Sequence, residues 1–436
     1  MTGSRVVELL KDLVEVETVN DPVRGLRVTR GEGLRIQEIL ASYGVEMDLL
    51  EHNGYPTLLA VKGEGRPVTL FMAHFDVVPP GPGWTVTSPF KPVVVDGYVY
   101  GRGAADDKSN VAAIAFALRD YQPVKGTIIV AFTGDEEIGG ANGAGMLAQR
   151  LEKEGLKPDY LVNGDGSLSR VITRRRSAFT ATVSVKEEPA VGSGRTGRRE
   201  FETRLVLRDT MHSAYFTPGV DMHALVAASL WARDAGFKIA RMEGDWVKSN
   251  VLPRRVRLEY VEPGVGRITY DEALTRLVDA VLPITRTPIP TEKYSDYGVS
   301  INPNLYKPGD THRLITDIRA MTTDTASVKE SLEDTLKETL PGASLEVKGG
   351  SGYLYTSRDA RLVKIASEAN SLLGLDPEPV EAGGASDSRY FSPRGVEAID
   401  YGPLGYNIHG PDERVSIDHL LKAVRFYRSI AERIHG

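Results

Sequence analysis

The chain has 436 residues, of which 41% are hydrophobic and 26% charged, with no cysteine and a formal net charge of −6. This length supports a large core in two or three domains, and the lack of cysteine excludes disulfides, thiolate metal ligands and a cysteine nucleophile. The acidic balance gives no electrostatic footprint for nucleic acid, so no nucleic-acid partner is expected. The short basic run Arg174–Arg176 is interpreted as a solvated strand end.

The N-terminal segment has apolar residues at helical spacing from Val6 to Val14, between charges, and no basic region followed by an apolar core. This pattern predicts an amphipathic helix rather than a signal peptide. No apolar run approaches the roughly 18 residues needed to span a bilayer. We therefore expect a soluble, cytoplasmic protein with no membrane partner.

Strands and helices alternate through the first part of the chain. The predicted strands are 46–50, 57–61, 67–73, 127–132 and 158–162, and the predicted helices are 33–43, 109–119 and 146–154. Asp96-Gly97 between apolar runs predicts a hairpin turn. Such alternation is typical of a doubly wound, mostly parallel sheet, here extending to about residue 175.

The pattern changes at Ser177 and changes back near residue 350. Between them we predict strands at 179–186, 201–207 and 314–319, helices at 220–235, 271–282 and 325–340, and a Gly-rich surface loop at Gly192–Arg199. Helices at 359–373 and 417–434 and a strand at 398–401 follow. The predicted organisation is an α/β domain (1–176 and 351–436) interrupted by an inserted α+β domain (177–350).

Acidic and imidazole side chains follow several of these buried strands. They are His74, Asp76, Asp106, Asp107, Glu136, Glu137 and Asp165, with an isolated late His409. Taken singly, a His-x-Asp pair is a common structural contact and adjacent acids are common loop charges. Because the carboxyl ends of parallel strands meet at one edge of a sheet, the combination favours a metal site, and without cysteine the ligands must be histidine and carboxylate.

Longer strings carry a resemblance to a known family. They are H-F-D-V-V-P-P-G (74–81), Y-G-R-G-A-A-D-D-K (100–108), T-G-D-E-E-I-G-G (133–140), N-G-D-G (163–166), H-S-A-Y-F-T-P-G (212–219), G-G-A-S-D-S-R-Y (383–390) and I-H-G-P-D-E (408–413). In this order they resemble the co-catalytic zinc metallopeptidases that include acetylornithine deacetylase, succinyl-diaminopimelate desuccinylase, aminoacylase, carboxypeptidase G and related dipeptidases.

The resemblance implies a site for two Zn²⁺, with Co²⁺ or Mn²⁺ as alternatives. Asp106 would bridge both ions, His74 and Asp165 would complete one, and Glu137 and His409 the other. Glu136 would be the general base and acid, acting on a water that two cations share and acidify. Asp76 would orient His74. The resemblance also implies a cis peptide between Asp106 and Asp107.

The resemblance implies that the α/β domain is catalytic and that the inserted domain, which would be ferredoxin-like, acts as a lid and forms a homodimer. His212 matches the lid histidine that in relatives reaches the partner's active site to stabilise an oxyanion, although a structural surface histidine is the plain alternative. Arg319 is our choice for binding a substrate carboxylate. The partner asparagine is open between Asn250 and Asn304, with Asn304 at the better spacing to Arg319. Ser386 and Arg389 could contact the acyl or side-chain end of the substrate.

Three departures from the family pattern concern the site and the lid. Asp165 is one methylene shorter than the Glu of the desuccinylase branch, and Ser109 stands where Gly is common. Gly192–Arg199 and parts of Pro253–Pro308 are insertions in the segment that selects substrate and partner subunit.

The resemblance implies a hydrolase that cleaves an amide bond in a small N-acyl amino acid. A carboxypeptidase or dipeptidase acting on a short peptide through the same site is the alternative. A non-catalytic binding relative is less consistent with the sequence, because Glu136 and every expected ligand are present. A serine hydrolase is disfavoured, since no G-x-S-x-G motif occurs.

Overall fold

The computed structural model describes residues 2–206 and 210–436. It divides into two compact units. The first comprises the chain up to Arg174 with Tyr353–Glu381 and Ser386–Gly436, and the second comprises Arg175–Gly352 with Ala382–Ala385. The second unit thus consists of the middle of the chain and of four residues at the beginning of the Gly-rich loop, Ala382–Ala385, which we predicted to lie in the α/β domain.

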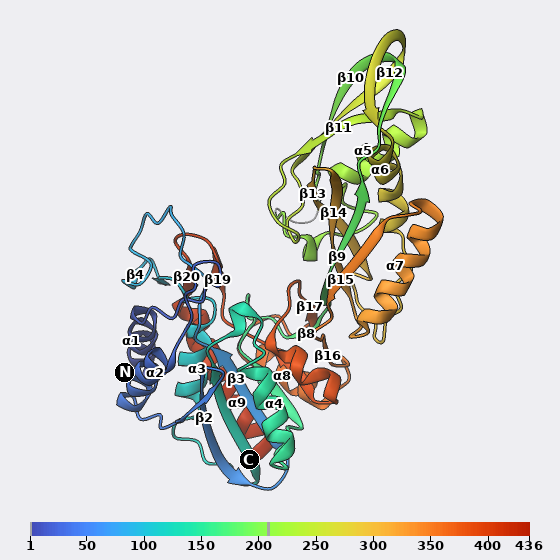
Figure 1. Ribbon diagram of the computed structural model, residues 1–436. Coiled ribbons are helices and arrows are strands. Elements are labelled where there is room, and N and C mark those ends of the chain that lie inside the picture. Colours follow the sequence, from blue (N-terminus) through green and yellow to red (C-terminus); the bar gives the residue numbers. More distant parts are fainter. Residues whose placement is uncertain (1, 207–209) are drawn as a thin grey trace. The chain divides into compact units, whose positions relative to one another are not determined.

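A nine-stranded sheet is the centre of the first unit (Figure 1). Its path is β1-β2-β6-β3-β7-β18-β8-β16, and β17 pairs with β8. The strands are β1 (Asp48–His52), β2 (Tyr55–Glu64), β3 (Val68–His74), β6 (Gly126–Thr133), β7 (Tyr160–Asn163), β8 (Ile172–Arg175), β16 (Leu354–Tyr355), β17 (Val380–Glu381) and β18 (Glu397–Asp400). The mixed, mainly parallel sheet confirms the predicted fold class.

The middle of this sheet is parallel and buried on both faces. Strand β3 pairs in parallel with β6 on one side and β7 on the other, with His74 opposite Thr133 and Met72 opposite Asn163. Every residue of β3 and β6 is buried, as expected for strands covered from both sides. The register brings the carboxyl ends of three strands to the same edge of the sheet.

Helices flank the sheet on both sides (Figure 1). They are α1 (Thr2–Glu15), α2 (Arg30–Ser42), α3 (Lys108–Leu118), α4 (Ala144–Lys153), α8 (Arg361–Leu372) and α9 (Ile417–His435). Helix α3 is buried along its whole length because it packs between α1, α9 and β3. It begins directly after Asp107, so its position in the core also fixes the Asp106 loop.

The described residues also form a small antiparallel sheet in the first unit and short 3₁₀ helices, of which η2 belongs to the second unit. The sheet has the order β19-β20-β5-β4. Its strands are β4 (Val93–Val95), β5 (Tyr98–Tyr100), β19 (Gly405–Tyr406) and β20 (Arg414–Ser416), and the 3₁₀ helices are η1 (Glu136–Ile138), η2 (Ser213–Tyr215), η3 (Asp387–Tyr390) and η4 (Ser392–Arg394). The predicted Asp96-Gly97 turn joins β4 to β5.

The second unit contains a four-stranded antiparallel sheet, a three-stranded sheet and three helices. The sheets have the orders β13-β14-β9-β15 and β10-β12-β11. The elements are β9 (Ser177–Lys186), β10 (Pro189–Glu202), α5 (Ala224–Ala235), β11 (Lys238–Gly244), β12 (Arg255–Asp271), α6 (Glu272–Thr285), β13 (Ser300–Lys307), β14 (Thr311–Ala320), α7 (Thr325–Thr339) and β15 (Ser344–Gly349). The series β9, α6, β13, β14, α7, β15 is the ferredoxin-like pattern, and β10 to β12 are inserted into it.

Two expectations for this unit are wrong. Gly192–Arg199 is not a loop but the middle of strand β10, which pairs with β12 along its whole length. The expected strand 201–207 is only the end of β10, and Leu207 lies outside the described residues. Ion pairs between exposed side chains, such as Arg195 with Glu262 at 2.6 Å, connect the two strands.

The basic run is also not a solvated strand end. Arg174, Arg175 and Arg176 are only 4%, 7% and 3% exposed. The Arg176 guanidinium donates hydrogen bonds to the carbonyl of Gly298 and to Ser300 Oγ. These three arginine side chains therefore lie inside the protein and do not form a phosphate-binding surface.

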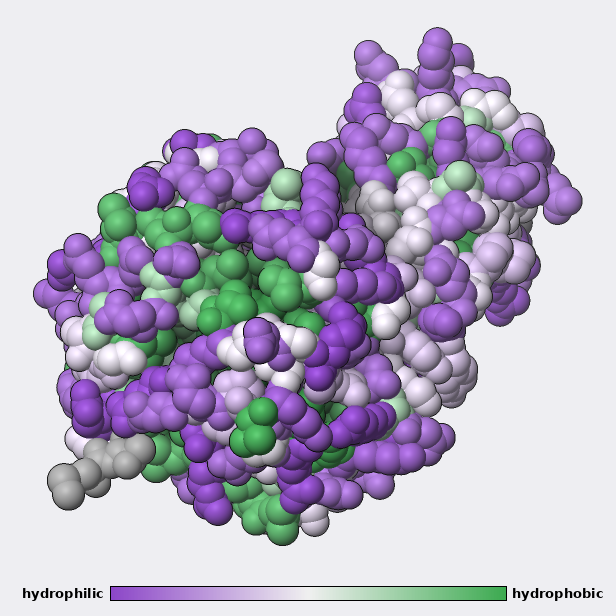
Figure 2. Space-filling model, turned by 90° about the horizontal axis from the view of Figure 1, so that it is seen from below, coloured by the Kyte–Doolittle hydropathy of each residue, from purple (hydrophilic) through white to green (hydrophobic). Residues whose placement is uncertain are grey.

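In the view from below, hydrophilic residues cover most of the visible face, with patches of hydrophobic residues between them (Figure 2). Within the part of the chain that the structure describes, no helix is long and apolar enough to cross a membrane.

Candidate metal centre and active site

The expected ligands come from five places at one edge of the central sheet. His74 is the last residue of β3, Asp106 and Asp107 precede α3, and Glu136 and Glu137 begin η1 just after β6. Asp165 follows β7, and His409 lies in the loop between β19 and β20. The parallel register of β3, β6 and β7 is the reason that residues far apart in sequence meet here.

Asp106 lies between the two imidazoles. Its Oδ1 is 3.1 Å from Nε2 of His74, and its Oδ2 is 3.1 Å from Nε2 of His409. One carboxylate thus presents a different oxygen to each imidazole, which is the arrangement required of a ligand shared by two cations. The peptide between Asp106 and Asp107 is cis, which confirms the expectation.

Glu137 joins His409 on the second side of Asp106. Its Oε1 lies 3.2 Å from Nε2 of His409, yet this buried oxygen accepts no hydrogen bond from any residue that the structure describes. The His409 imidazole is therefore close to the carboxylates of both Asp106 and Glu137, but its orientation does not suit a hydrogen bond to Glu137. An unsatisfied buried carboxylate oxygen beside an imidazole nitrogen fits a position where both atoms face a cation.

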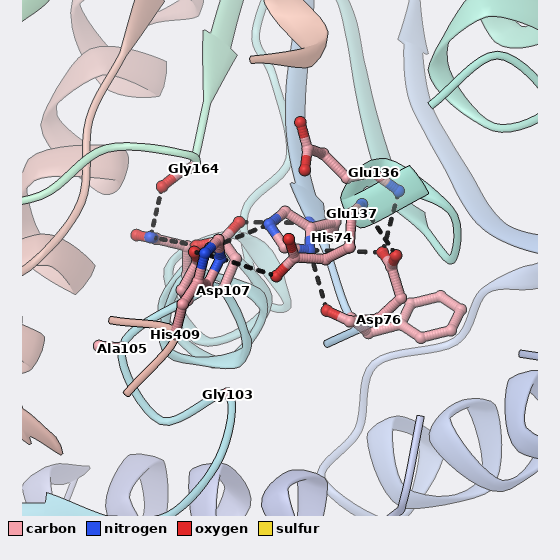
Figure 3. A network of polar contacts seen from close by, with 12 residues as sticks. His74, Asp76, Gly103, Ala105, Asp107, Glu136, Glu137, Gly164 and His409 are labelled. Atoms are coloured by element: carbon pink, nitrogen blue, oxygen red, sulfur yellow. Dashed lines mark hydrogen bonds and ion pairs between the residues drawn. The ribbon is translucent and has the colours of Figure 1, made fainter. Parts of the chain in front are cut away.

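Asp76 organises the start of this cluster (Figure 3). Its Oδ1 accepts the backbone N–H of Glu136 at 3.1 Å, and its Oδ2 accepts the N–H of Glu137 at 3.0 Å and Asn20 Nδ2 at 2.7 Å. His74 Nδ1 lies 3.1 Å from the Asp76 carbonyl oxygen and 3.4 Å from Oδ1. Asp76 therefore orients the imidazole and also fixes the turn that carries both glutamates.

The carboxylate of Glu136 carries no dashed contact in Figure 3, while its backbone nitrogen is held by Asp76. Burial raises the pKa of Glu136, with nearby Asp76 and Asp106 adding to the shift against the opposing charge of His74. A raised pKa brings a carboxyl closer to the range in which it can both take and return a proton.

Two side chains of η3 hold the other end of the η1 turn. Arg389 Nη2 and the Tyr390 hydroxyl both donate to the carbonyl of Gly139, at 2.6 Å and 2.5 Å. Ser386 is 1% exposed, and its Oγ has no hydrogen-bond partner among the described residues. Arg389 thus supports the turn of Glu136, whereas Ser386 offers a free hydroxyl.

The ionisation of the cluster follows from this crowding. Burial alone would lower the pKa of His409, but the close Asp106 and Glu137 carboxylates outweigh it and raise the pKa to about 11. The pKa of Glu137 rises to about 7 because of burial and the neighbouring Asp106 charge. Contacts with both imidazoles overcome the burial of Asp106 and lower its pKa. Without cations, protons on the imidazoles balance the carboxylates.

The donor set suits two divalent cations. His74, Glu136 and Asp165 each offer a ligand atom, and these atoms lie within 4.8 Å of one another. The same holds for Asp106, Glu137 and His409. Imidazole and carboxylate are ligands for zinc and for manganese or cobalt, so the residues fit such ions.

The expected lid residues belong to the second unit. His212 Nδ1 accepts the N–H of Ala214 at 3.1 Å, and Asn250 Nδ2 lies 3.3 Å from His212 Nε2. Arg319 binds Asp317 through Nε at 3.0 Å and Nη2 at 3.2 Å, so one edge of its fork is already occupied.

Asn304 has a different environment from Asn250. It is fully buried, its Nδ2 donates to the carbonyl of Ser249 at 2.6 Å, and its Oδ1 lies 3.1 Å from Nε2 of His223. Both ends of the Asn304 amide are therefore used inside the second unit.

Some residues that position the site differ in how clearly the sequence marks them. Asn20 lies in an ordinary turn cluster, and nothing in the sequence connects it with Asp76. Arg102 and Glu413 are different, because they lie inside the matched strings Y-G-R-G and I-H-G-P-D-E and could have been singled out there.

Known proteins with similar sequences or folds include desuccinylases, dipeptidases and a metallo-carboxypeptidase. Residues 70–433 match the model of peptidase family M20/M25/M40. A succinyl-diaminopimelate desuccinylase from Xanthomonas euvesicatoria pv. vesicatoria is 28% identical over 445 residues, covering 99% of each chain. An aminoacylhistidine dipeptidase from Vibrio alginolyticus shares the fold with a TM-score of 0.72 and 16% identity, over 98% of this chain and 96% of that one. A metallo-carboxypeptidase of the M20 family from Sulfolobus solfataricus has a TM-score of 0.61 and 16% identity, over 98% of each chain.

The fold, the acid and imidazole cluster and these similarities define a metal-dependent hydrolase of amide bonds. The chain belongs to peptidase family M20/M25/M40, since the family match covers most of its length.

Proposed function

We propose that this protein removes the acyl group from a small N-acyl amino acid, with two divalent cations and Glu136 as general base and acid. The observation that carries the proposal is the Asp106 carboxylate between His74 and His409, each at 3.1 Å, beside Glu136. The substrate class is supported by desuccinylase relatives that match along nearly the whole chain.

Each residue has a distinct task in this proposal. When bound, the cations supply positive charge that polarises the amide carbonyl and makes water more acidic. His74 and Asp165 would hold one cation, Glu137 and His409 the other, and Asp106 both. Glu136 takes the proton of the attacking water and gives it to the leaving nitrogen, so that the amine departs neutral.

The second unit would supply substrate recognition as a lid, and we propose a homodimer in which His212 serves the partner's site. His212 Nδ1 accepts the Ala214 N–H, which orients the ring, and Nε2, now 3.3 Å from Asn250 Nδ2, is the atom that would face a developing oxyanion once substrate displaces this contact. We assign the substrate carboxylate to Asn250 and the open edge of Arg319. Asn304 is less suitable, because its amide is engaged on both sides.

A dipeptidase or carboxypeptidase with the same site is the second candidate, favoured by Asp165 in place of a longer Glu. A panel of N-succinyl and N-acetyl amino acids and of dipeptides, each with Zn²⁺, Co²⁺ or Mn²⁺, distinguishes the two. We expect the highest kcat/KM on an N-acyl amino acid. Preference for dipeptides would replace the first proposal by the second, and hydrolysis of none of them would refute both.

Two variants test the assigned roles. Glu136→Gln keeps the shape of the side chain but cannot take a proton, so kcat should fall by roughly 10²–10⁴, while the protein still binds two cations. Asn250→Ala should raise KM, whereas Asn304→Ala should lower stability instead. Full activity of Glu136→Gln would remove the proposed base.

A further inference from the structure

Arg102 and Glu413 lie in matched strings but have no part in the proposed reaction. Both are buried, with 1% and 0% of their surface exposed, and their side chains form an ion pair through Nη1 and Oε2. A buried ion pair is weak evidence for stability, because desolvating two charges offsets much of their attraction. The other contacts of the pair indicate what it does.

The Glu413 carboxylate binds the backbone just before the Asp106 side chain. Its Oε2 accepts the N–H of Gly103 at 3.1 Å, and its Oε1 accepts the N–H of Ala105 at 2.9 Å and of Asp106 at 3.0 Å. Gly103 and Ala105 lie below the His74 cluster in Figure 3. With three N–H groups bound to one rigid carboxylate, the segment leading to Asp106 cannot shift without breaking charge-assisted hydrogen bonds.

Arg102 extends this fixation to two other loops. Its Nη2 donates to the carbonyl of Pro80 at 3.3 Å, in the segment after His74 and Asp76, and to the carbonyl of Gly410 at 3.2 Å, next to His409. One guanidinium therefore connects the loops that carry His74, Asp106 and His409.

The His409 loop needs such support. Asn407, His409 and Asp412 all have left-handed backbone conformations, with φ of 56°, 63° and 53°. Residues other than glycine adopt this region at an energetic cost, and such conformations persist where the surroundings over-determine them. The Asp412 carboxylate accepts the N–H groups of Thr85 at 2.9 Å and Val86 at 3.0 Å, which secures one end of the loop, and Arg102 holds it beside His409.

We propose that Arg102 and Glu413 are positioning residues that set Asp106 midway between His74 and His409 and thereby determine how tightly the two cations bind. This inference rests on the proposed two-metal function. Neither residue touches the substrate, so the effect belongs to cation affinity rather than to proton transfer.

The test uses Glu413→Gln in the full-length protein. Gln has the same shape, but its NH₂ group must face one or two of the backbone N–H groups that the carboxylate now binds. We expect the affinity for Zn²⁺, measured against a competing chelator, to fall by roughly 10- to 100-fold. The absorption spectrum of the Co²⁺ form should also change, while kcat at saturating cation stays within a few-fold of wild type.

Glu397→Gln is the matched control. The Glu397 carboxylate also accepts a backbone N–H, that of Leu362 at 3.1 Å, but it lies outside the ligand cluster. This substitution should leave cation affinity unchanged. Arg102→Lys keeps the charge, but its single ammonium group cannot contact Glu413, Pro80 and Gly410 together. If Glu413→Gln does not fold, the cation affinity of Arg102→Lys tests the proposal in its place.

The possible outcomes separate this inference from the proposed function. If the wild-type protein binds two cations and both Glu413→Gln and Arg102→Lys bind them equally well, the positioning role is wrong. If the wild-type protein binds no cations and hydrolyses no amide, the proposed function fails, and the inference fails with it. Weaker binding in Glu413→Gln but not in Glu397→Gln supports it.

Discussion

Substitution of Asp76 by Asn tests whether one buried carboxylate fixes both the imidazole and the catalytic turn. In the wild type, its two oxygens accept three N–H donors, from Glu136, Glu137 and Asn20, and the side chain is fully buried. Asn has almost the same shape but only one acceptor oxygen. Whichever way the amide is turned, its NH₂ group faces at least one of these donors.

The expected size of the effect follows from the number of N–H donors that lose their acceptor. If the remaining oxygen takes the place of Oδ2, two donors keep a weaker partner and the Glu136 N–H loses its own. A buried donor without a partner costs about 1–3 kcal/mol, which corresponds to roughly 5- to 150-fold faster exchange of the amides that the contact protects. Loss of the carboxylate beside His74 should weaken cation binding by roughly 10- to 100-fold.

Hydrogen exchange followed by mass spectrometry on the segment around Glu136 measures the first effect, and chelator competition measures the second. Asp159→Asn is the control, since Asp159 accepts the N–H of Val68 at 2.7 Å at the opposite end of the same strand, β3. It should change neither quantity. Unaltered protection of the Glu136 amide together with unaltered cation affinity in Asp76→Asn would refute the reasoning.

Two other predictions concern the ionisation and the shape of the site. The pKa of His409 is about 11 in the cation-free protein, so a proton occupies this ligand throughout the neutral range and must leave when a cation binds. Affinity for the second cation should therefore rise by roughly tenfold per pH unit between about pH 8 and pH 10, and more steeply below about pH 7, where Glu137 also carries a proton. Proton release is measurable by calorimetry in buffers of different ionisation enthalpy, and a flat profile would contradict this. At Gly140, with φ +64°, an added Cβ would lie 1.9 Å from Asp387 Oδ1, so Gly140→Ala should displace the Glu136 turn. We expect kcat to fall by at least about tenfold, whereas Gly155→Ala, with φ +74° and nothing within 4 Å, should retain activity.

The cluster at the sheet edge was predictable because its geometry depends on local signals. Each of His74, Glu136 and Asp165 follows an apolar run short enough to be a strand, and parallel strands bring such positions together without further information. Asn20 could not be found in this way. Its contact with Asp76 depends on where an irregular turn lies in space, and no periodicity encodes that.

Strand β10 shows why part of the second unit was not predictable. Glycine is depleted in strands and the segment is also highly charged, so the sequence suggested a surface loop. In the structure its glycines leave room for aromatic rings: a Cβ at Gly197 would lie 2.5 Å from the ring of Tyr260, and one at Gly192 would lie 3.1 Å from that of Tyr270. Pairing with β12 supplies the backbone hydrogen bonds and side-chain contacts that the segment cannot form by itself. The prediction for the three consecutive arginines was wrong for a related reason, because Gly298 and Ser300, the partners of Arg176, are more than 100 residues away in the sequence.

The late position of His409 and Glu413 has a consequence for biosynthesis. A ribosome adds about 5–20 residues per second, so the 335 residues between His74 and His409 take roughly 15–70 s to make. During that time the nascent chain exposes Asp106, Glu136 and Glu137 without their last partners. The complete ligand set, and with it the loop that Arg102 and Glu413 hold together, exists only once residues 409–413 have been made, so the proposed cations would bind as a pair after this segment is synthesised rather than guide the folding of the segments before it.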